Sequence, residues 1–256
     1  MALTGEHQHP DIKIFVSAHK PAVFPEGNSI LPVQVGVAHA ARRFDSTLHD
    51  DEGENISDKN PRYCELTAQY WAWKNEDADY YGFCHYRRYF DFTDTPHQEN
   101  DYGEIIDSYI DSQTIEKYGI NDGDISKAVD GWDVITTPLN DTRRIGGFTN
   151  LKQHWDADRH LRLKDLRHMY DILCARHPDY KADADAVLNG HTAAFCNMFI
   201  MKKDIFFEYN EWLFPLLDEF AEHTDFSKMD VQTTRTVGHL SERLLNIFLA
   251  HKQRTG

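Results

Sequence analysis

The sequence predicts an α/β protein with an open, mainly parallel sheet flanked by helices and with a helical C-terminal part. Short apolar runs of strand length alternate along the chain with longer segments of helical periodicity, and this alternation favours parallel pairing. At 256 residues and 41% hydrophobic, the chain can bury a full core, and it shows neither an internal repeat nor a low-complexity linker. We therefore expect a single domain over residues 1–256, with residues 1–11 as a flexible tail.

The N-terminal third predicts a strand, a loop and a helix. The run "IKIFVSAHK" alternates and then ends in polar groups, as the first strand of an open sheet does when its carboxyl end faces a ligand. The segment "PVQVGVAHAARRF" follows as a helix or a strand-helix mixture, and residues 50–60 lack apolar periodicity, which indicates a loop. Asn60 before Pro61 predicts a helix start, because asparagine caps free backbone NH groups and proline fits a first turn. This helix should end near Asn75.

The remaining chain continues the alternation. "YYGFCHYRRYF" begins as a buried strand, and residues 93–130 form an acidic, loop-rich region with short helices. The aromatic residues of "YWAW" and "EWLF" lie on apolar helix faces and are expected in the core. The later elements are expected to be a strand in "WDVITTP", a loop in "NDTRRIGGFTN", a helix over residues 156–177, a strand in "AAFCNMFIMKK", a helix in "DIFFEYNEWLFPLLDEFAEH" that can kink at Pro215, and a last helix in "HLSERLLNIFLAH".

Charge and composition exclude several classes of protein. The 27 basic and 42 acidic residues give a formal charge of −15, which argues against nucleic-acid binding, because a basic surface supplies most of that affinity. The four cysteines are widely spaced and form no CxxC pair, so we expect free thiols in a reducing compartment. No export signal and no apolar run of about 20 residues is present, so we expect a soluble, cytoplasmic protein, with peripheral membrane contact as a compatible addition.

Two adjacent arginines stand where the strand in "YYGFCHYRRYF" should end. Arg87 and Arg88 then lie at the carboxyl end of a strand, which is where open α/β sheets bind ligands. The guanidinium fork suits phosphate oxygens, and two forks together with His85 can neutralise a diphosphate. The alternative is a structural ion pair with Asp91, or with Glu65 on the preceding helix.

Other polar groups are expected near the same edge of the sheet. His19 and Lys20 end the first strand, although a lysine in that position is commonly only solvated. Asn55, Ser57 and Asn60 offer neutral donors and acceptors that can read a base or a ribose, and a plain Asx-rich turn explains them almost as well.

Two carboxylates stand out. Glu65 follows Asn60 by about one helical turn and can point either at Arg87 or into a pocket. Glu242 and Arg243 begin the last helix, where a carboxylate can act chemically or can simply complement the helix dipole. The dinucleotide, P-loop, hydrolase-elbow and zincin motifs are absent, and the 15 histidines form no ligand pair at helical spacing.

Four ordered blocks of the chain resemble a family of bacterial capsular and exopolysaccharide biosynthesis glycosyltransferases, long described as a domain of unknown function and associated with galactofuranosyl transfer. The resemblance runs from about Ile12 to Leu249, and four blocks in order are a more specific signal than any single one. The blocks are "DDEGENISDKNPRYCELTAQYWAWKN", "YYGFCHYRRYF", "CNMFIMKKDIFFEYNEWLF" and "GHLSERLLNIFL".

The resemblance implies a GT-A-like, Rossmann-like glycosyltransferase that takes a UDP-sugar, with galactofuranose as the expected sugar, and passes the sugar to a glycan acceptor. A lipid-linked acceptor would place the protein at the inner face of the cell membrane. In many GT-A enzymes the corresponding strand ends in an Asp-x-Asp motif that binds a divalent metal, whereas here His85, Tyr86 and Arg87 stand in that place. This departure predicts that no metal cofactor is required and that the arginines stabilise the leaving diphosphate.

The resemblance also assigns roles to residues. Inverting enzymes of this fold often place an acidic base near the start of a late helix, and Glu242 matches best by its order along the chain, with Asp225, Asp230 and His191 as weaker candidates. The candidate catalytic residues are therefore Glu242, Arg87 and Arg88. The candidate substrate-binding residues are His19, Lys20, Asn55, Ser57, Asn60, Glu65, His85, Tyr86, Asn197 and Arg243.

Two other classes of function stay open from the sequence alone. Without an Asp-x-Asp motif, the chain could be a non-catalytic protein that binds a sugar nucleotide or a polysaccharide within an assembly complex. A metal-dependent hydrolase built on His85, His154 and His191 needs a zinc site that the spacing of these residues does not supply.

Overall fold

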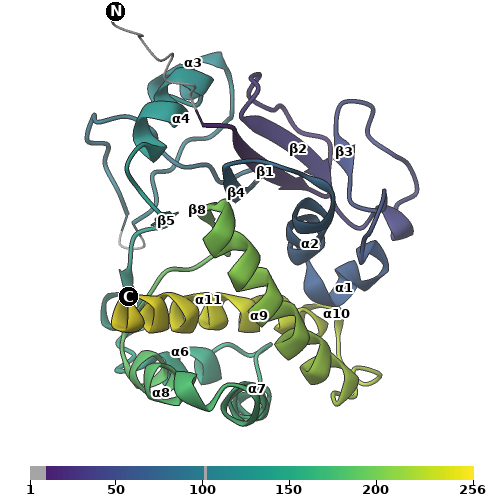
Figure 1. The fold of residues 1–256 in the computed structure, drawn as a ribbon, viewed down its shortest axis with the longest axis vertical. Helices are drawn as coiled ribbons and strands as arrows, with labels where there is room; N and C mark the ends of the chain where they lie inside the picture. Colours follow the sequence, from purple (N-terminus) through teal and green to yellow (C-terminus); the bar gives the residue numbers. More distant parts are fainter. Residues whose placement is uncertain (1–9, 101–102) are drawn as a thin grey trace, which may run out of the picture.

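The fold is built on a six-stranded sheet in the order β3-β2-β1-β4-β8-β5 (Figure 1). Its strands are β1 (Ile12–Ala18), β2 (Ile30–Gln34), β3 (Leu48–His49), β4 (Tyr80–His85), β5 (Val134–Thr136) and β8 (Phe199–Lys202). The first four strands of this order are mutually parallel, whereas β8 is antiparallel to both β4 and β5. The computed structural model describes residues 10–100 and 103–256. The expected fold class, an open and mainly parallel sheet flanked by helices, is confirmed.

Successive side chains of β1 and β4 point to opposite faces of the sheet, and nearly all of them are buried. Both faces of the sheet are therefore covered, and helices provide the cover. Phe15 and Phe83 stack with ring centroids 5.4 Å apart in the larger core, together with residues of α2 (Leu66–Asn75) and α9 (Lys203–Glu222). Ile14 belongs to the smaller core on the other face, which includes residues of α4 (Asp122–Val129). The aromatic residues Trp71 and Trp212 are buried in the larger core, as expected from the sequence.

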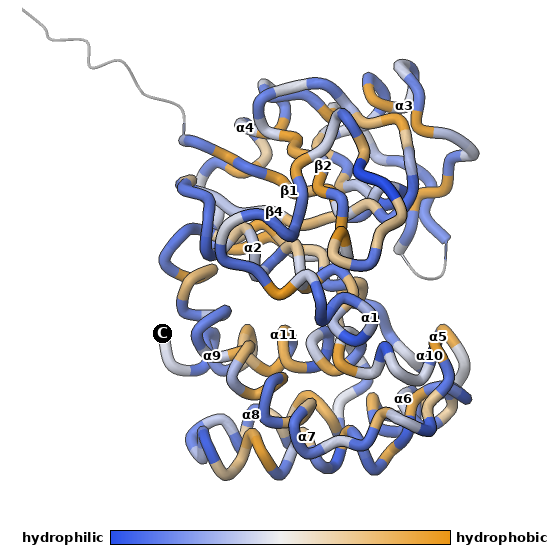
Figure 2. The backbone as a smooth tube through the Cα atoms, turned by 90° about the vertical axis from the view of Figure 1, so that its right-hand side faces the viewer, coloured by the Kyte–Doolittle hydropathy of each residue, from blue (hydrophilic) through white to orange (hydrophobic). Residues whose placement is uncertain are grey.

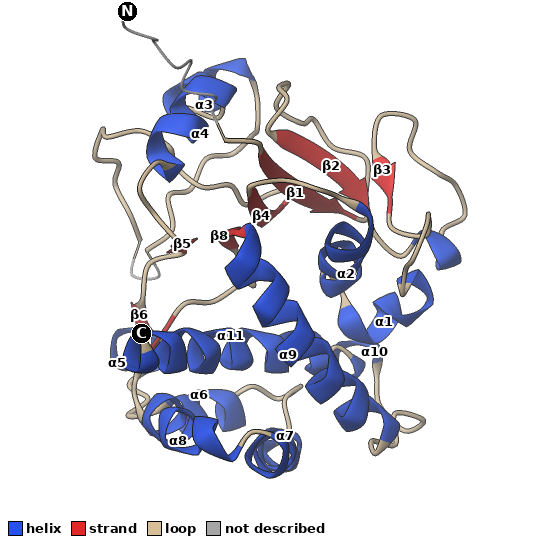
Figure 3. Cartoon of the chain, viewed as in Figure 1, coloured by secondary structure: helices blue, strands red, loops and turns tan. Residues whose placement is uncertain are grey.

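A long helix, α11 (Thr236–Thr255), lies between the sheet and a layer made of α6 (Leu151–Ala157), α7 (Leu163–Arg176) and α8 (Lys181–Asn189). Figure 3 shows the six-stranded sheet in the upper half and these helices in the lower half, and Figure 2 shows the same division after a quarter turn. Because neighbours cover α11 on several sides, its residues are buried almost continuously from Thr236 to Phe248. The short elements are η1 (Val37–His39), η2 (Ser57–Lys59), α3 (Ser112–Lys117), β6 (Asn140–Asp141), α5 (Thr142–Gly146), η3 (Pro178–Tyr180), β7 (Thr192–Ala193) and α10 (Val231–Thr234).

The prediction of one continuous helix from Pro61 to Asn75 is wrong. A short helix, α1 (Asn60–Tyr63), ends at Cys64, whose φ of 53° is left-handed, and α2 begins two residues later. Asn60 is not the N-cap, because its side-chain amide donates to the carbonyl of Cys64 and to the Thr67 hydroxyl. The side chain of Asn60 therefore links the end of α1 to the start of α2.

Four other boundaries differ from the expectations. The helix expected over residues 156–177 is divided between α6 and α7, and the loop expected in "NDTRRIGGFTN" contains β6 and α5. Only residues 199–202 of "AAFCNMFIMKK" form β8, because the backbone reverses at Cys196 and Asn197. The last helix begins at Thr236 instead of His239, and α8 was not expected from the sequence.

The expected flexible tail lies almost wholly outside the described residues. Asp11, which is described, donates its backbone NH to the carboxylate of Asp79. The four cysteines are free, as expected. In the described part of the chain, no helix combines the length and the apolar character needed to cross a membrane. The single-domain assignment stays a prediction.

One buried carboxylate, Asp50, ties together the loops that follow β2 and β3. Asp50 is fully buried and accepts hydrogen bonds from the backbone NH groups of Gly36 and Val37 and from the hydroxyls of Ser57 and Thr67. We expect Asp50→Ala to lower the free energy of unfolding by about 3 kcal/mol or more, because several buried donors lose their acceptor.

Urea denaturation measures this loss. The matched control is Asp58→Ala, because Asp58 lies in the same loop but is exposed. We expect the control to change the free energy of unfolding by less than about 0.5 kcal/mol. Equal losses in the two variants would contradict the role assigned to Asp50.

Candidate active site

The carboxyl ends of β1 and β4 lie side by side. Ser17 of β1 pairs in register with His85 of β4, so the residues that follow the two strands emerge at the same edge of the sheet. His85 and Arg88 exchange two backbone hydrogen bonds, of 3.1 and 2.9 Å, which close a tight turn. Tyr86 and Arg87 occupy the tip of this turn.

Aromatic rings and positive charges pack together at this edge. The ring of Tyr86 meets the ring of His19 edge-on at 5.3 Å, and the Arg87 guanidinium lies 5.1 Å from the centre of the Tyr86 ring. Burial, followed by the positive charges of Lys20 and Arg87, lowers the pKa of His19. Near neutral pH this imidazole is therefore uncharged, and the positive charge of the edge comes from lysine and arginine.

Arg87 and Arg88 are exposed and form no ion pair with any described residue. The carboxylate of Asp91 accepts instead from Thr93 and His97, and that of Glu65 accepts from Asn197. The alternative in which these arginines are neutralised by Asp91 or Glu65 is therefore contradicted. Two unneutralised guanidinium groups in a chain of charge −15 are available to an anionic ligand.

A strained turn at Cys196 and Asn197 connects β4 with α11. Both residues have left-handed backbones, with φ of 76° and 49°, and such conformations cost about 1–3 kcal/mol each in residues other than glycine. The Nε2–H of His85 donates to the carbonyl of Cys196 at 2.8 Å. The backbone NH of Cys196 donates to Glu242 at 3.2 Å. The turn thus places a carboxylate of α11 beside the arginine-bearing edge.

Asn197 is buried and holds this turn in place. Its amide NH₂ donates to Glu65 at 2.7 Å and to the carbonyl of Gly238 at 3.0 Å, and its amide oxygen accepts from Ser241. Asn197 and Glu65, both predicted as substrate-binding residues, are therefore bound to each other, and they join α2 to the start of α11.

Glu242 lies in the second turn of α11, so the interpretation of this carboxylate as a first-turn partner of the helix dipole does not apply. Its Oε2 accepts from Arg243 at 2.7 Å, and its Oε1 accepts from the NH of Cys196. A carboxylate oxygen has two lone pairs, so each oxygen keeps capacity for a further proton donor.

Arg243 lies beneath Glu242 and is only 3% exposed, which corrects its predicted role as a substrate ligand. Its guanidinium lies 5.2 Å from the centre of the Trp155 ring and 5.1 Å from that of Phe195. One terminal nitrogen donates to Nδ1 of His154 at 3.2 Å, while Nε has no hydrogen-bond partner among the described residues. Arg243 therefore orients Glu242 through its hydrogen bond to Oε2.

The structure places three other candidates in internal hydrogen bonds. The side-chain oxygen of Asn55 accepts from the backbone NH of Ser57 at 3.2 Å, which matches the Asx-turn alternative, and its NH₂ group donates to the carbonyls of Asp51 and Gly53. Ser57 is buried and donates to Asp50, and Asn60 closes the break between α1 and α2. These side chains shape the loop beside the edge, and their predicted contacts with a base or a ribose find no support in the geometry.

The weaker candidates for a catalytic base lie in other local contacts. Asp230 caps α10 through the NH of Thr233, and Asp225 accepts from Ser227. The carbonyl of His191 accepts from Thr142, next to the two-stranded sheet formed by β6 and β7.

Sequence reasoning missed Arg235. This exposed arginine immediately precedes α11, donates from Nε to the Cys64 sulfur at 3.3 Å, and adds to the positive charge that lowers the pKa of His19. The sequence places it in an apparent loop with no pattern to distinguish it. Its place near the sheet edge depends on tertiary contacts at the start of α11, among them the packing of Gly238 against Cys64 and the hydrogen bond from Asn197 to the carbonyl of Gly238.

No group of three or more His, Cys, Asp or Glu residues able to hold a metal occurs within residues 10–100 and 103–256. The turn that corresponds to an Asp-x-Asp motif carries His85, Tyr86, Arg87 and Arg88, and the two guanidinium groups repel cations. The same finding removes the support for a zinc hydrolase built on His85, His154 and His191.

His154 provides a pH-dependent test of the support beneath Glu242. Burial, followed by the charge of Arg243, lowers the pKa of His154 from 6.5 to about 4. Between these two pKa values the unfolded chain binds a proton at His154 and the folded chain does not. The contribution of neutral His154 to the free energy of unfolding is therefore fully present above pH 6.5 and is lost as the pH falls toward about 4.

We expect His154→Asn to weaken this dependence, because the asparagine oxygen can accept from Arg243 as Nδ1 does but does not titrate. The measurement is the urea unfolding free energy at several pH values between neutrality and the folded-state pKa. Parallel curves for the two proteins would show that His154 does not contribute.

The parallel strands, the antiparallel β8 and the helical C-terminal part together define a GT-A-like α/β protein with a cationic sheet edge. The chain belongs to the family described as "Domain of unknown function (DUF4422)", whose model matches residues 13–253. This match confirms the membership that the four sequence blocks indicated. No match was found among the curated proteins.

One solved structure similar to this chain is described as the apo structure of the WbbM bifunctional glycosyltransferase. The two chains share 35% sequence identity, and their superposition gives a TM-score of 0.92. The match covers 96% of this chain and 43% of the WbbM chain, so this chain spans less than half of the length of that protein.

Proposed function

We propose that this protein is a glycosyltransferase that moves a sugar, galactofuranose, from a UDP-sugar to a glycan acceptor in capsular or exopolysaccharide synthesis. The observation that carries the proposal is the pair Arg87 and Arg88, which are exposed at the carboxyl end of β4 and have no carboxylate partner within residues 10–100 and 103–256. The similarity to a bifunctional glycosyltransferase supports the same reaction class. Because the match covers 43% of that chain, the proposal assigns one transfer reaction to this chain.

The proposed chemistry is a displacement with inversion. An acceptor hydroxyl oxygen attacks the anomeric carbon, the bond from that carbon to the diphosphate oxygen breaks, and UDP leaves with the electron pair. The hydroxyl proton passes to Glu242, whose carboxylate is oriented by Arg243 and the NH of Cys196. Negative charge grows on the leaving diphosphate, so fixed cations stabilise the transition state more than the ground state.

The cations available for that role are Arg87 and Arg88 in the turn, with Lys20 and Arg235 beside His19. No step is assigned to a metal, and the reaction is proposed to proceed without a metal cofactor. A lipid-linked acceptor and a place at the inner face of the cell membrane belong to the same proposal.

The test is incubation of the protein with UDP-galactofuranose, UDP-galactose and UDP-glucose in the presence of EDTA, with a glycan acceptor prepared from the corresponding polysaccharide. We expect release of UDP and extension of the acceptor with one of these donors. If none of the nucleotide sugars binds or turns over, the proposal is wrong. Tight UDP binding without transfer to any acceptor would favour the alternative, a non-catalytic protein that binds nucleotide sugars within an assembly complex.

A further inference from the structure

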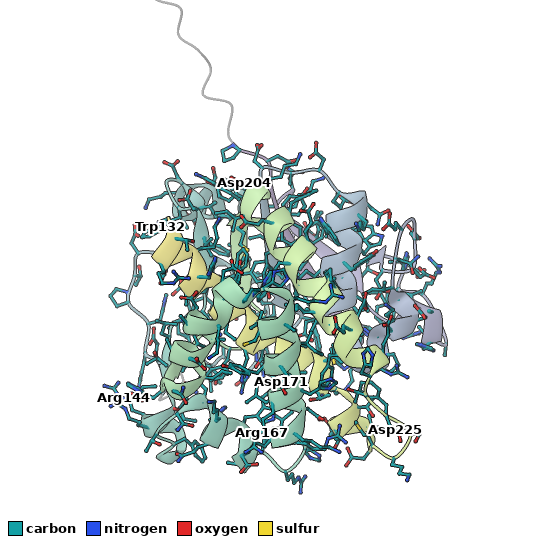
Figure 4. All side chains as sticks on the ribbon, turned by 60° about the horizontal axis from the view of Figure 1, so that its bottom comes forward. Trp132, Arg144, Arg167, Asp171, Asp204 and Asp225 are labelled. Carbon is teal, nitrogen blue, oxygen red and sulfur yellow. The ribbon has the colours of Figure 1, made fainter. Side chains whose placement is uncertain are left out.

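A cavity of about 550 Å³ lies in the helical part of the molecule, away from the carboxyl edge of the sheet. Its walls come from α6, α7 and α8, and its volume falls in the range of about 300–1,000 Å³ that is usual for ligand pockets. Figure 4, in which the bottom of the molecule comes forward, shows Arg167 and Asp171 of α7 on this side. Nothing in the proposed transfer reaction uses this cavity.

The walls carry polar groups with free hydrogen-bonding capacity. Gln153 and Asp156 line the cavity from α6, and Arg167 and Asp171 line it from α7. Within the described residues, the amide NH₂ of Gln153 and the charged groups of the other three make no hydrogen bond or ion pair. The spacings of three and four residues put each pair on one face of its helix. The cavity therefore presents donors and acceptors from both sides.

The same cavity has apolar walls. Leu163, Leu166 and Leu188 line it beside the ring of Tyr170. The hydroxyl of Tyr170 accepts from Lys181 at 3.0 Å and donates to Asp185 at 2.7 Å, so the ring is held in place. An apolar surface with a fixed aromatic ring suits the CH face of a sugar, while planar polar side chains suit its hydroxyl groups.

The charge of the lining argues against an anionic ligand. Lys152 and Arg167 contribute positive charge, and Asp156, Asp171 and Asp185 contribute negative charge, so the sum is slightly negative. A nucleotide or another phosphate would need an excess of cations, as at the edge of the sheet. A neutral, polyhydroxylated ligand needs no such excess.

The cavity also lies next to the residues that contact Arg243, the hydrogen-bond partner of Glu242. On α6, Gln153 and Asp156 line the cavity, while His154 and Trp155 contact the Arg243 guanidinium. Leu166, Tyr170 and Leu188 separate the cavity from a small void whose far wall includes Arg243. A ligand in the cavity thus contacts the helices that pack against the proposed catalytic carboxylate.

We infer that this cavity is a second carbohydrate-binding site, which holds a neutral stretch of glycan distant from the place of sugar transfer. The identification of this glycan as the acceptor rests on the proposed function. The binding of a glycan in the cavity does not depend on the proposed function.

The experiment measures binding of linear galactose oligosaccharides of increasing length by calorimetry, without any donor, to the full chain. The wild-type protein is compared with the double variant Arg167→Ala, Asp171→Asn and with the matched control Arg144→Ala, an exposed arginine of α5 outside the cavity. We expect affinity that increases with length, a loss of about tenfold or more in the double variant, and no change in the control. Both substitutions are at exposed positions, and circular dichroism checks that the variants fold.

Absence of binding to the wild-type protein, or equal affinity in the wild type and the double variant, overturns the inference. The two proposals are separated by the transfer assay. A wild-type protein that binds the oligosaccharides but transfers no sugar overturns the proposed function and leaves this site in place. A protein that transfers sugar with the same acceptor KM in the wild type and the double variant overturns the link to the acceptor.

Discussion

Replacing both arginines of the turn after β4, in the double variant Arg87→Ala, Arg88→Ala, is expected to lower kcat/KM for the donor by about a thousandfold or more. Removal of a single preorganised donor to a developing negative charge typically costs about 100-fold to 1,000-fold, and here two charged donors are lost. UDP binding should weaken together with turnover, because we propose that the same groups contact the diphosphate before and during its departure.

The fold should survive this substitution. Both side chains are exposed, and neither forms an ion pair within the described residues, so no partner is left unpaired. Steady-state kinetics, UDP titration and thermal unfolding are measured on the same preparations, with Arg144→Ala as the control for loss of one exposed arginine. If the double variant unfolds, the arginines are structural. If it retains wild-type kinetics, the anion site lies elsewhere.

Substitution of the proposed base, Glu242→Gln, is expected to lower kcat by about 100-fold to 10,000-fold and to leave UDP binding nearly unchanged. Glutamine keeps the shape of the side chain and an oxygen that can accept from Arg243 or from the NH of Cys196, but it cannot take the proton of the acceptor hydroxyl. The combination of lost turnover with retained UDP affinity separates a chemical role from a binding role.

A structural effect must be separated from the chemical one, because Arg243 is buried and Glu242 is its carboxylate partner. Thermal unfolding of Glu242→Gln measures that contribution. Glu222→Gln, which changes an exposed carboxylate at the end of α9, is the control. Retention of wild-type kcat in Glu242→Gln would mean that another group accepts the proton.

Elements with a strong local pattern were predictable. β1 and β4 are continuous apolar runs because both faces of the sheet are covered, and α9 carries a regular apolar stripe that fills the larger core. From these elements the position of Arg87 and Arg88 followed directly, because residues after neighbouring parallel strands meet at one edge.

Elements shaped by distant contacts were not predictable. The helix α8 has only two large apolar residues, Val187 and Leu188, and its place depends on contacts with α11 that include Asp183 bound to His251 and Arg254. The backbone reversals at Cys64 and Cys196 occur without glycine, so no residue type announces them. They persist because surrounding hydrogen bonds offset the strain.

By itself, the sequence determined the class of fold and the edge of the sheet at which the cationic side chains lie, because hydrophobic periodicity and strand ends are local properties. The tertiary structure alone decided which polar groups remain available. Arg87 and Arg88 form no ion pair with the residues that the structure describes, Glu65 accepts from Asn197, and Arg243 donates to Glu242. These outcomes follow from contacts between residues far apart in the chain, and no local pattern encodes the distance between two such side chains.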